Sequence, residues 1–170
     1  MISTKLNDAF NTQIDNELAS AHLYLSMAAY FESMSLPGFA NWMRIQHQEE
    51  MTHALKFFDY VNARNGRVIL GAISKPITDF ESIGAALMQA LENEQKVSAM
   101  INKLYEISSQ EKDYASQVLL EWFINEQVEE EKSVTDVIDQ LRISGGEGAG
   151  LLMLDDKLAA RIPEPDATTQ

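Results

Sequence analysis

The sequence predicts an all-α fold: a four-helix bundle with one long crossover connection between the second and third helices and a short fifth helix near the C-terminus. Three observations support this prediction. Apolar residues recur in steps of three and four in four long segments, turn signals between those segments are sparse, and one irregular stretch of 18 residues separates the second segment from the third. With 170 residues, the chain is long enough for one domain with a proper core and too short for two comfortable ones.

Each long segment carries one apolar seam. Steps of three and four keep a set of side chains on a single helix face, as in the interior of a bundle. The seams are Leu6, Phe10, Gln13, Glu17, Ser20, Tyr24, Met27 and Phe31 in residues 4–34; Phe39, Met43, Gln46, Glu50, His53, Phe57 and Tyr60 in residues 38–64; Ile83, Leu87, Ala90, Glu94, Val97, Ile101 and Leu104 in residues 82–111; and Leu120, Phe123, Gln127, Glu130, Val134, Val137 and Leu141 in residues 113–143.

Turn signals separate these segments. Pro37-Gly38 breaks the chain after the first segment, Asn65-Gly66 opens the irregular stretch over residues 65–82, and Asp113 fits the N-cap of the fourth segment. Helices of about 28 residues span roughly 40 Å. The irregular stretch, extended at about 3.3 Å per residue, is long enough to run the full length of such a bundle. We therefore expect it to be the crossover connection.

Four glycines crowd the segment after Ser144 and precede a short apolar piece. We expect this piece to form the fifth helix, over about residues 148–159, and the glycines to act as a hinge that directs it away from the bundle. The polar residues 161–170 are expected to form a disordered tail.

Every seam is interrupted near its middle by a carboxylate. These carboxylates are Glu17, Glu50, Glu94 and Glu130. His53 follows one turn after Glu50, and Gln127 precedes Glu130 by one turn. If helices of similar length pack side by side, these groups converge in the core, where four unpaired carboxylates would repel one another and be costly to desolvate. Either the carboxyls are largely neutral or a positive ion lies between them.

Taken singly, each of these residues has an ordinary structural explanation. A lone glutamate on a seam more often reaches water at an edge, and Tyr24 is by default a core aromatic with a bonded hydroxyl. The acidic run NEQVEEEKS at 125–133 is by default a solvated helix face, and we expect Glu131 to remain solvated. Independent accidents would not place one carboxylate at the centre of all four seams, so the whole pattern favours a metal site.

The ligand types indicate the class of metal. Carboxylate oxygens with one imidazole, and no cysteine anywhere in the chain, suit iron or manganese better than a closed structural zinc site. Carboxylates can bridge, so four of them with one histidine can hold two divalent ions.

The pattern of Glu17 and Tyr24, QEEMTH (48–53), Glu94 and EQVEEE (126–131) closely resembles that of the non-haem ferritins of the prokaryotic type, within the ferritin-like di-iron carboxylate family. The resemblance covers essentially the whole chain. It implies that Glu17, Glu50 and His53 form the first iron site of a dinuclear ferroxidase centre. Glu50 would bridge to a second site, which is completed by Glu94 and Glu130 with Gln127 nearby, and Tyr24 would be the tyrosine beside the centre. Glu49, Glu126 and Glu129, together with Glu130, would form a third iron site.

The resemblance also implies a function. Such proteins oxidise Fe(II) to Fe(III) with O2 or H2O2 and store hydrous ferric oxide inside a shell of 24 identical subunits. Bacterioferritins repeat Glu-x-x-His on a second helix, whereas Ser133 follows Glu130 here. We therefore expect no haem and interpret Met51 as a packing residue. A haem-containing bacterioferritin, a di-iron enzyme that acts on an organic substrate, and a bundle that binds metal without oxidising it remain alternatives.

The net charge of −13 argues against nucleic-acid binding, which needs a basic face, and suits a protein that handles cations. No signal-like or membrane-spanning segment is visible, so we expect no membrane association and a cytoplasmic location.

Overall fold

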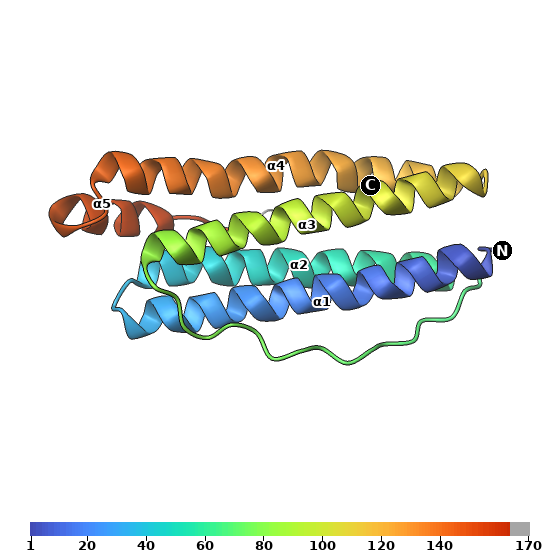
Figure 1. The fold of residues 1–170 in the computed structure, drawn as a ribbon, viewed down its shortest axis with the longest axis horizontal. Coiled ribbons are helices and arrows are strands. Elements are labelled where there is room, and N and C mark those ends of the chain that lie inside the picture. The colour runs from blue at the N-terminus through green and yellow to red at the C-terminus, as the bar shows by residue number, and fades with distance from the viewer. Residues whose placement is uncertain (164–170) are drawn as a thin grey trace.

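The computed structural model describes residues 1–163 and shows an all-helical chain, which confirms the predicted fold class (Figure 1). The elements are α1 (Thr4–Ser33), α2 (Pro37–Ala63), α3 (Ile83–Gln110), α4 (Tyr114–Ser144) and α5 (Gly148–Ala159). The four long helices lie side by side as a bundle, with α1 packed along α2 and α3 along α4. Their ends differ from the predicted ranges by no more than one residue. From residue 164 onward, the predicted tail lies outside the described part of the chain.

Local side-chain chemistry sets the helix ends. Ser3, Ser82 and Asp113 each accept a hydrogen bond from the backbone N–H three residues later, at 3.2, 3.0 and 3.0 Å. At the other end of α4, Gly145 adopts a left-handed conformation with φ 82°, which a glycine accommodates without strain.

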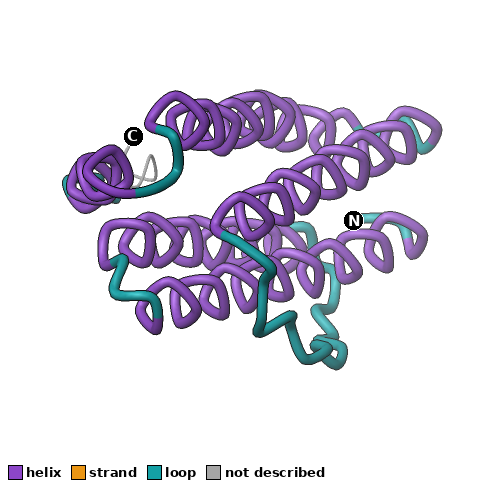
Figure 2. The backbone as a smooth tube through the Cα atoms, turned by 60° about the vertical axis from the view of Figure 1, so that its left-hand side comes forward, coloured by secondary structure: helices purple, strands orange, loops and turns teal. Residues whose placement is uncertain are grey.

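The connection between α2 and α3 is an extended, irregular segment that runs along the outside of α1 (Figure 2). Side chains spaced four residues apart on α1 hold it in place: Asn7, Asn11 and Asp15 accept hydrogen bonds from the N–H groups of Arg67, Ile69 and Gly71 at 3.0, 2.9 and 2.8 Å. Alternate residues of an extended chain are about 6.6 Å apart, which is close to the rise of four helical residues. The matched spacing allows a helix to fasten a segment that forms no sheet.

The short helix α5 packs against α2 and α4, so the expectation that the glycines direct it away from the bundle is wrong. Asp155, which is buried, accepts a hydrogen bond from the N–H of Phe39 at 2.9 Å. It thus satisfies a free donor in the first turn of α2, whose N-cap Leu36 makes no side-chain hydrogen bond. The two helices approach so closely that a Cβ on Gly38 would lie 1.7 Å from the carbonyl oxygen of Asp155.

Two buried apolar clusters fill the bundle, and a polar layer separates them along every long helix. One cluster contains Phe10 of α1 and Phe57 of α2, and the other contains Tyr24 and Met43 of the same helices. Glu17 and Glu50 lie between them in the chain and are fully buried. Within residues 1–163, no helix is both long and apolar enough to cross a membrane.

Candidate metal centre

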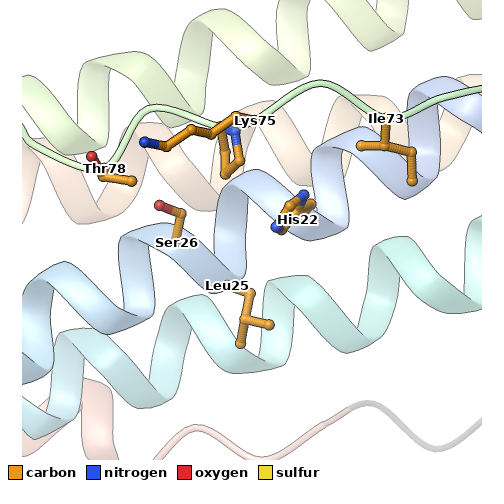
Figure 3. A pocket seen from close by; sticks show the side chains of 7 residues that line it. His22, Leu25, Ser26, Ile73, Lys75 and Thr78 are labelled. Atoms are coloured by element: carbon orange, nitrogen blue, oxygen red, sulfur yellow. The ribbon is translucent and has the colours of Figure 1, made fainter.

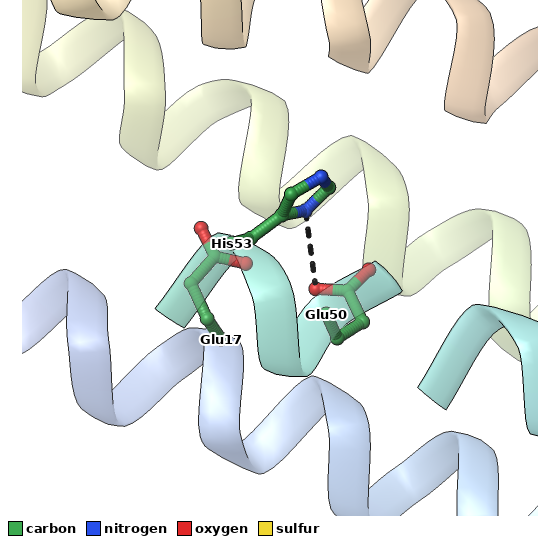
Figure 4. A group of neighbouring side chains, drawn as sticks. All are labelled: Glu17, Glu50 and His53. Carbon is green, nitrogen blue, oxygen red and sulfur yellow. Dashed lines mark ion pairs between the residues drawn. The ribbon is translucent and has the colours of Figure 1, made fainter. Parts of the chain in front are cut away.

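Three side chains from α1 and α2 meet in the polar layer. Glu17 projects from α1, and Glu50 and His53 project from one face of α2 because they are three residues apart (Figure 4). One ligand atom from each lies within 4.8 Å of the other two, and all three residues are buried. The structure therefore brings together the three residues for which the sequence predicted a first metal site.

Four polar atoms in this group have no hydrogen-bond partner. They are Oε2 of Glu17, both carboxylate oxygens of Glu50, and Nδ1 of His53. Buried polar atoms are almost always paired, and an unpaired one costs about 1–3 kcal/mol or more. Four such atoms close together are the arrangement expected of the ligands of a metal ion.

A second group shares His53 with α4. Nε2 of His53 lies 4.0 Å from Oε1 of Glu126, and these two residues with Glu130 offer ligand atoms within 4.8 Å of one another. Glu126 and Glu130 are four residues apart and therefore lie on the same side of α4. The acidic run on this helix is divided, because Glu130 is buried, Glu126 is half-buried and Glu129 is exposed.

Glu94 enters the layer from α3 and is held by two neighbours. The hydroxyl of Tyr24 donates to Glu94 Oε1, and the amide of Gln127 donates to its Oε2 at 3.2 Å. The same amide nitrogen lies 3.2 Å from the backbone carbonyl of Glu94. Tyr24 and Gln127 therefore fix the orientation of this carboxylate across three helices.

Burial dominates the electrostatics of the layer. It raises the pKa of Glu17 from 4.5 to about 7, and it raises the pKa of Glu50 well above the usual range, with further contributions from the charges of Glu94, Glu17 and Glu130. The pKa values of Glu94 and Glu130 are also raised, chiefly by burial. In the metal-free chain, these carboxyls therefore hold protons that water-exposed carboxyls would lose.

Burial lowers the pKa of His53 to about 4, with a smaller contribution from the charge of Lys56. The imidazole is therefore neutral near pH 7, and the 3.9 Å between its Nδ1 and Oε2 of Glu50 (Figure 4) is not a working ion pair at that pH. A neutral imidazole is the form that binds a metal ion.

Two glutamines support the carboxylates, a role that the seam pattern alone did not reveal. Gln13 donates to Oε1 of Glu17 at 2.8 Å, and Gln46 donates to Oε2 of Glu130 at 2.7 Å. Both occupy seam positions, Gln13 one turn before Glu17 and Gln46 one turn before Glu50. A polar residue on an otherwise apolar seam was the signal that could have found them. Such neighbours orient ligands and tune their basicity.

The remaining predicted residues lie around the layer. Glu49 is half-buried on α2 and accepts two hydrogen bonds from Arg161, and Met51, two residues later, is also half-buried. Glu129 belongs to neither of the two groups described above. Glu131, expected to be solvated, is half-buried and accepts a hydrogen bond from Ser98 of α3 at 2.5 Å. That expectation was wrong because Glu131 lies on a side of α4 that contacts α3.

A cavity of about 520 Å³ lies apart from this layer, between α1 and the crossover (Figure 3). It is lined by His22, Leu25, Ser26, Ile73, Lys75, Pro76 and Thr78, none of which belongs to either group of candidate ligands. The residues that line it include the cationic Lys75 and no carboxylate, so it is unsuited to hold a metal ion.

The chemistry of the buried donors is that of a site for hard cations. Oxygen ligands dominate, one neutral imidazole assists, and carboxylates in general can bridge two ions. Anionic oxygen stabilises Fe(III) more than Fe(II), so such a ligand set favours oxidation of bound iron.

Comparison with known proteins agrees with this chemistry. The Ferritin-like domain family matches residues 7–144 of the chain. The bacterial non-heme ferritins of Staphylococcus aureus (strain USA300) and Staphylococcus haemolyticus (strain JCSC1435) are 38% and 39% identical to it over 161 residues, which are 95% of this chain and 97% of each relative.

Solved structures show the same likeness. An open pore ferritin from the hyperthermophilic archaeon Archaeoglobus fulgidus is 47% identical, with a TM-score of 0.94 over 95% of this chain and 100% of that one. A closed form of the Archaeoglobus fulgidus ferritin, engineered by site-directed mutagenesis, is also 47% identical, with a TM-score of 0.94 over 96% and 99% of the two chains. With the sequence, the fold and the composition of its buried polar layer in agreement, the chain belongs to the ferritin family.

Proposed function

We propose that this ferritin stores iron and oxidises Fe(II) to Fe(III) at a dinuclear centre inside each subunit. The observation that carries the proposal is the set of buried, unpartnered ligand atoms on Glu17, Glu50 and His53. A protein with no cation to bind there would be more stable with apolar residues at these positions.

The residues divide into those that hold iron and those that orient the ligands. Glu17 and His53 hold one Fe(II) with Glu50, which bridges to a second ion held by Glu94 and Glu130, with Gln127 beside it. Tyr24 and Gln127 fix Glu94 through their hydrogen bonds. Because the carboxyls of the metal-free chain retain protons, binding of iron releases these protons to water.

The electrons of the oxidation balance when two iron ions react together. Two Fe(II) lose one electron each, and these two electrons with two protons reduce one O2 to H2O2, or one H2O2 to two waters. Two iron sites in one subunit therefore match a two-electron oxidant. The alternative of an oxygenase requires an organic substrate beside the metals, and the residues on either side of the polar layer are packed apolar clusters.

The stored ferric oxide requires an enclosed space. By likeness to the ferritins described above, the chain assembles as a shell of 24 subunits in the cytoplasm and deposits oxidised iron in its cavity.

The proposal predicts that the purified protein has a native mass of about 24 subunits and gains iron when Fe(II) is added in air. Sedimentation or mass photometry gives the mass, and the absorbance of ferric iron follows the oxidation. An assembly of monomers or dimers, or binding of Fe(II) without oxidation, would contradict the function.

The proposed third iron site yields a separate prediction. Glu126 lies near His53 and Glu130, whereas Glu129 is exposed, so a third cation there would have fewer fixed ligands and more water. The double variant Glu126→Ala, Glu129→Ala should keep fast initial oxidation and lose one bound iron per subunit. It should also change the amount of oxidant consumed per iron.

The matched control is Glu121→Ala, Asp139→Ala, which removes the same charge from exposed positions on α4. Titration with Fe(II) under anaerobic conditions counts the sites. Equal numbers of sites in the double variant and the unmodified protein would show that the acidic run is a solvated face.

A further inference from the structure

Arg161 lies two residues after the end of α5, and its side chain contacts α2. Its Nη2 donates to both oxygens of Glu49, at 3.1 and 2.8 Å, and its Nη1 donates to Oε1 of Gln46 at 2.5 Å. The guanidinium also lies over the ring of Trp42, 4.8 Å from its centroid. The side chains of Arg161 and Glu49 are only 23% and 17% exposed, so water screens this ion pair less than one on the open surface.

The docking of α5 sets this position. The amide of Asn41 on α2 donates to the backbone carbonyl of Arg161 at 3.1 Å and lies 3.4 Å from those of Leu158 and Ala159. These carbonyls lie at and just after the C-terminal end of α5, where backbone carbonyls have no partner four residues further on in the helix. Asp155 fastens the same helix to the first turn of α2. Arg161 is therefore held on both its backbone and its side chain.

The contacts of Arg161 lead directly to the proposed ligands. Glu49 is one of the carboxylates proposed for the third iron site. Gln46 accepts from Arg161 through Oε1 and donates through Nε2 to Glu130 at 2.7 Å. Because the guanidinium only donates, it fixes which end of the Gln46 amide faces Glu130. The charge of Arg161 also lowers the pKa of Glu130, against the larger effect of burial.

We propose that Arg161 is a built-in counter-cation for the third iron site: it neutralises Glu49 while iron is absent, and a cation that binds Glu49 must displace it. The inference rests on the third site of the proposed function. A guanidinium and a metal ion compete for the same two carboxylate oxygens, so the pair weakens cation binding at this site. It thereby makes the third site fill after the first two. Arg161 is thus a positioning residue that links the end of α5 to the order in which iron binds.

The first test measures binding with Zn²⁺, a divalent probe that does not undergo oxidation, on the assembled iron-free protein. Arg161→Gln should lower the apparent dissociation constant of the weakest Zn²⁺ in each subunit by about tenfold, as expected for loss of a half-buried ion pair with charge-assisted hydrogen bonds. The tighter Zn²⁺ affinities should not change. Arg161→Lys keeps the positive charge but lacks the planar guanidinium. Its dissociation constant for the weakest Zn²⁺ should therefore lie between those of the unmodified protein and Arg161→Gln.

Arg142→Gln is the matched control, because it removes the same charge from an exposed arginine of α4 that pairs with Asp139. It should leave all the Zn²⁺ affinities unchanged. This comparison separates a direct contact with Glu49 from a general change in the net charge of the shell.

The second test reports the displacement itself. In a Trp122→Phe background, Trp42 is the one remaining tryptophan, since the chain contains two. Its fluorescence should change as the weakest Zn²⁺ binds, because the guanidinium leaves its ring. The change in that phase should be absent when Arg161→Gln is added to the same background.

The outcomes are distinct. A third, weaker Zn²⁺ that binds with equal or lower affinity in Arg161→Gln overturns the inference and leaves the third site intact. If no variant binds a third Zn²⁺, the third site itself is wrong and Arg161 has nothing to regulate. Tighter binding in Arg161→Gln, with no change in Arg142→Gln and loss of the Trp42 signal, supports the inference.

Discussion

Replacing Glu50 with alanine is expected to slow Fe(II) oxidation by roughly 100-fold or more. Loss of a residue that merely orients a metal ligand costs about 10–100-fold, and Glu50 is proposed to bind both ions directly. Both of its oxygens are buried, and burial together with the neighbouring carboxylates raises the pKa of Glu50 well above the usual range, so the ionised group is costly in the metal-free chain. The variant should therefore fold and assemble normally, and its metal-free form should be at least as stable as the unmodified protein.

Stopped-flow absorbance of ferric iron measures the rate, and anaerobic binding of Co²⁺ provides a readout that is independent of oxidation. Glu92→Ala, which removes an exposed carboxylate from α3, is the matched control and should behave like the unmodified protein. An oxidation rate in Glu50→Ala that matches this control would place the chemistry elsewhere in the chain.

The bundle was predictable because its signals are local and repeated. Nearly every seam position is buried in the structure, from Leu6 to Phe31 on α1 and from Leu87 to Leu104 on α3. Periodicity identifies a buried face without knowledge of the neighbouring helix. The length of the irregular stretch was enough to predict a crossover. Its fastening to α1 by Asn7, Asn11 and Asp15 was not predicted, because polar residues spaced four apart on a helix look like an ordinary solvated face.

The convergence of the candidate ligands followed from the same periodicity. Glu17, Glu50 and His53 meet because the middles of aligned helices lie at one level of the bundle. The contacts of α5 could not be obtained in this way. Asp155 and Arg161 act on α2 across more than 100 residues of chain, and neither lies in a periodic pattern that points to its partner. Docking of a short helix depends on the shape of the assembled bundle, which the pattern of one segment does not encode.

The metal-free protein is expected to lose stability as the pH rises from 6.5 to 8.5. Burial raises the pKa of Glu17 from 4.5 to about 7, so the stability contributed by this carboxyl is fully present below pH 4.5 and is lost as the pH rises through 7. Between pH 6.5 and 8.5, the carboxyl of Glu17 alone lowers the free energy of unfolding by about 1 kcal/mol. Glu50 and Glu130 act in the same direction at higher pH, because their pKa values are raised further.

His53 has the opposite effect in a lower range of pH. Its pKa is lowered from 6.5 to about 4, so the stability that it contributes is present above pH 6.5 and is lost as the pH falls through 4. At pH 6.5 the imidazole of the unfolded chain is still half protonated, so His53 offsets part of the loss near that pH, and above about pH 7.5 it is neutral in both the folded and the unfolded chain. The range from 7.5 to 8.5 therefore isolates the carboxyls.

Urea unfolding in EDTA at several pH values measures how the free energy of unfolding changes with pH. Glu17→Gln should reduce this change, whereas the exposed Glu92→Gln should not. Added Zn²⁺ should reverse the dependence on pH, because the cation binds the deprotonated carboxylates and competes with their protons. The stabilisation by Zn²⁺ should thus grow from pH 6.5 to 8.5, over the same range in which the metal-free protein weakens. If the metal-free protein instead gains stability as the pH rises, the buried carboxyls do not hold protons, and a compensating positive charge must already be present in the layer.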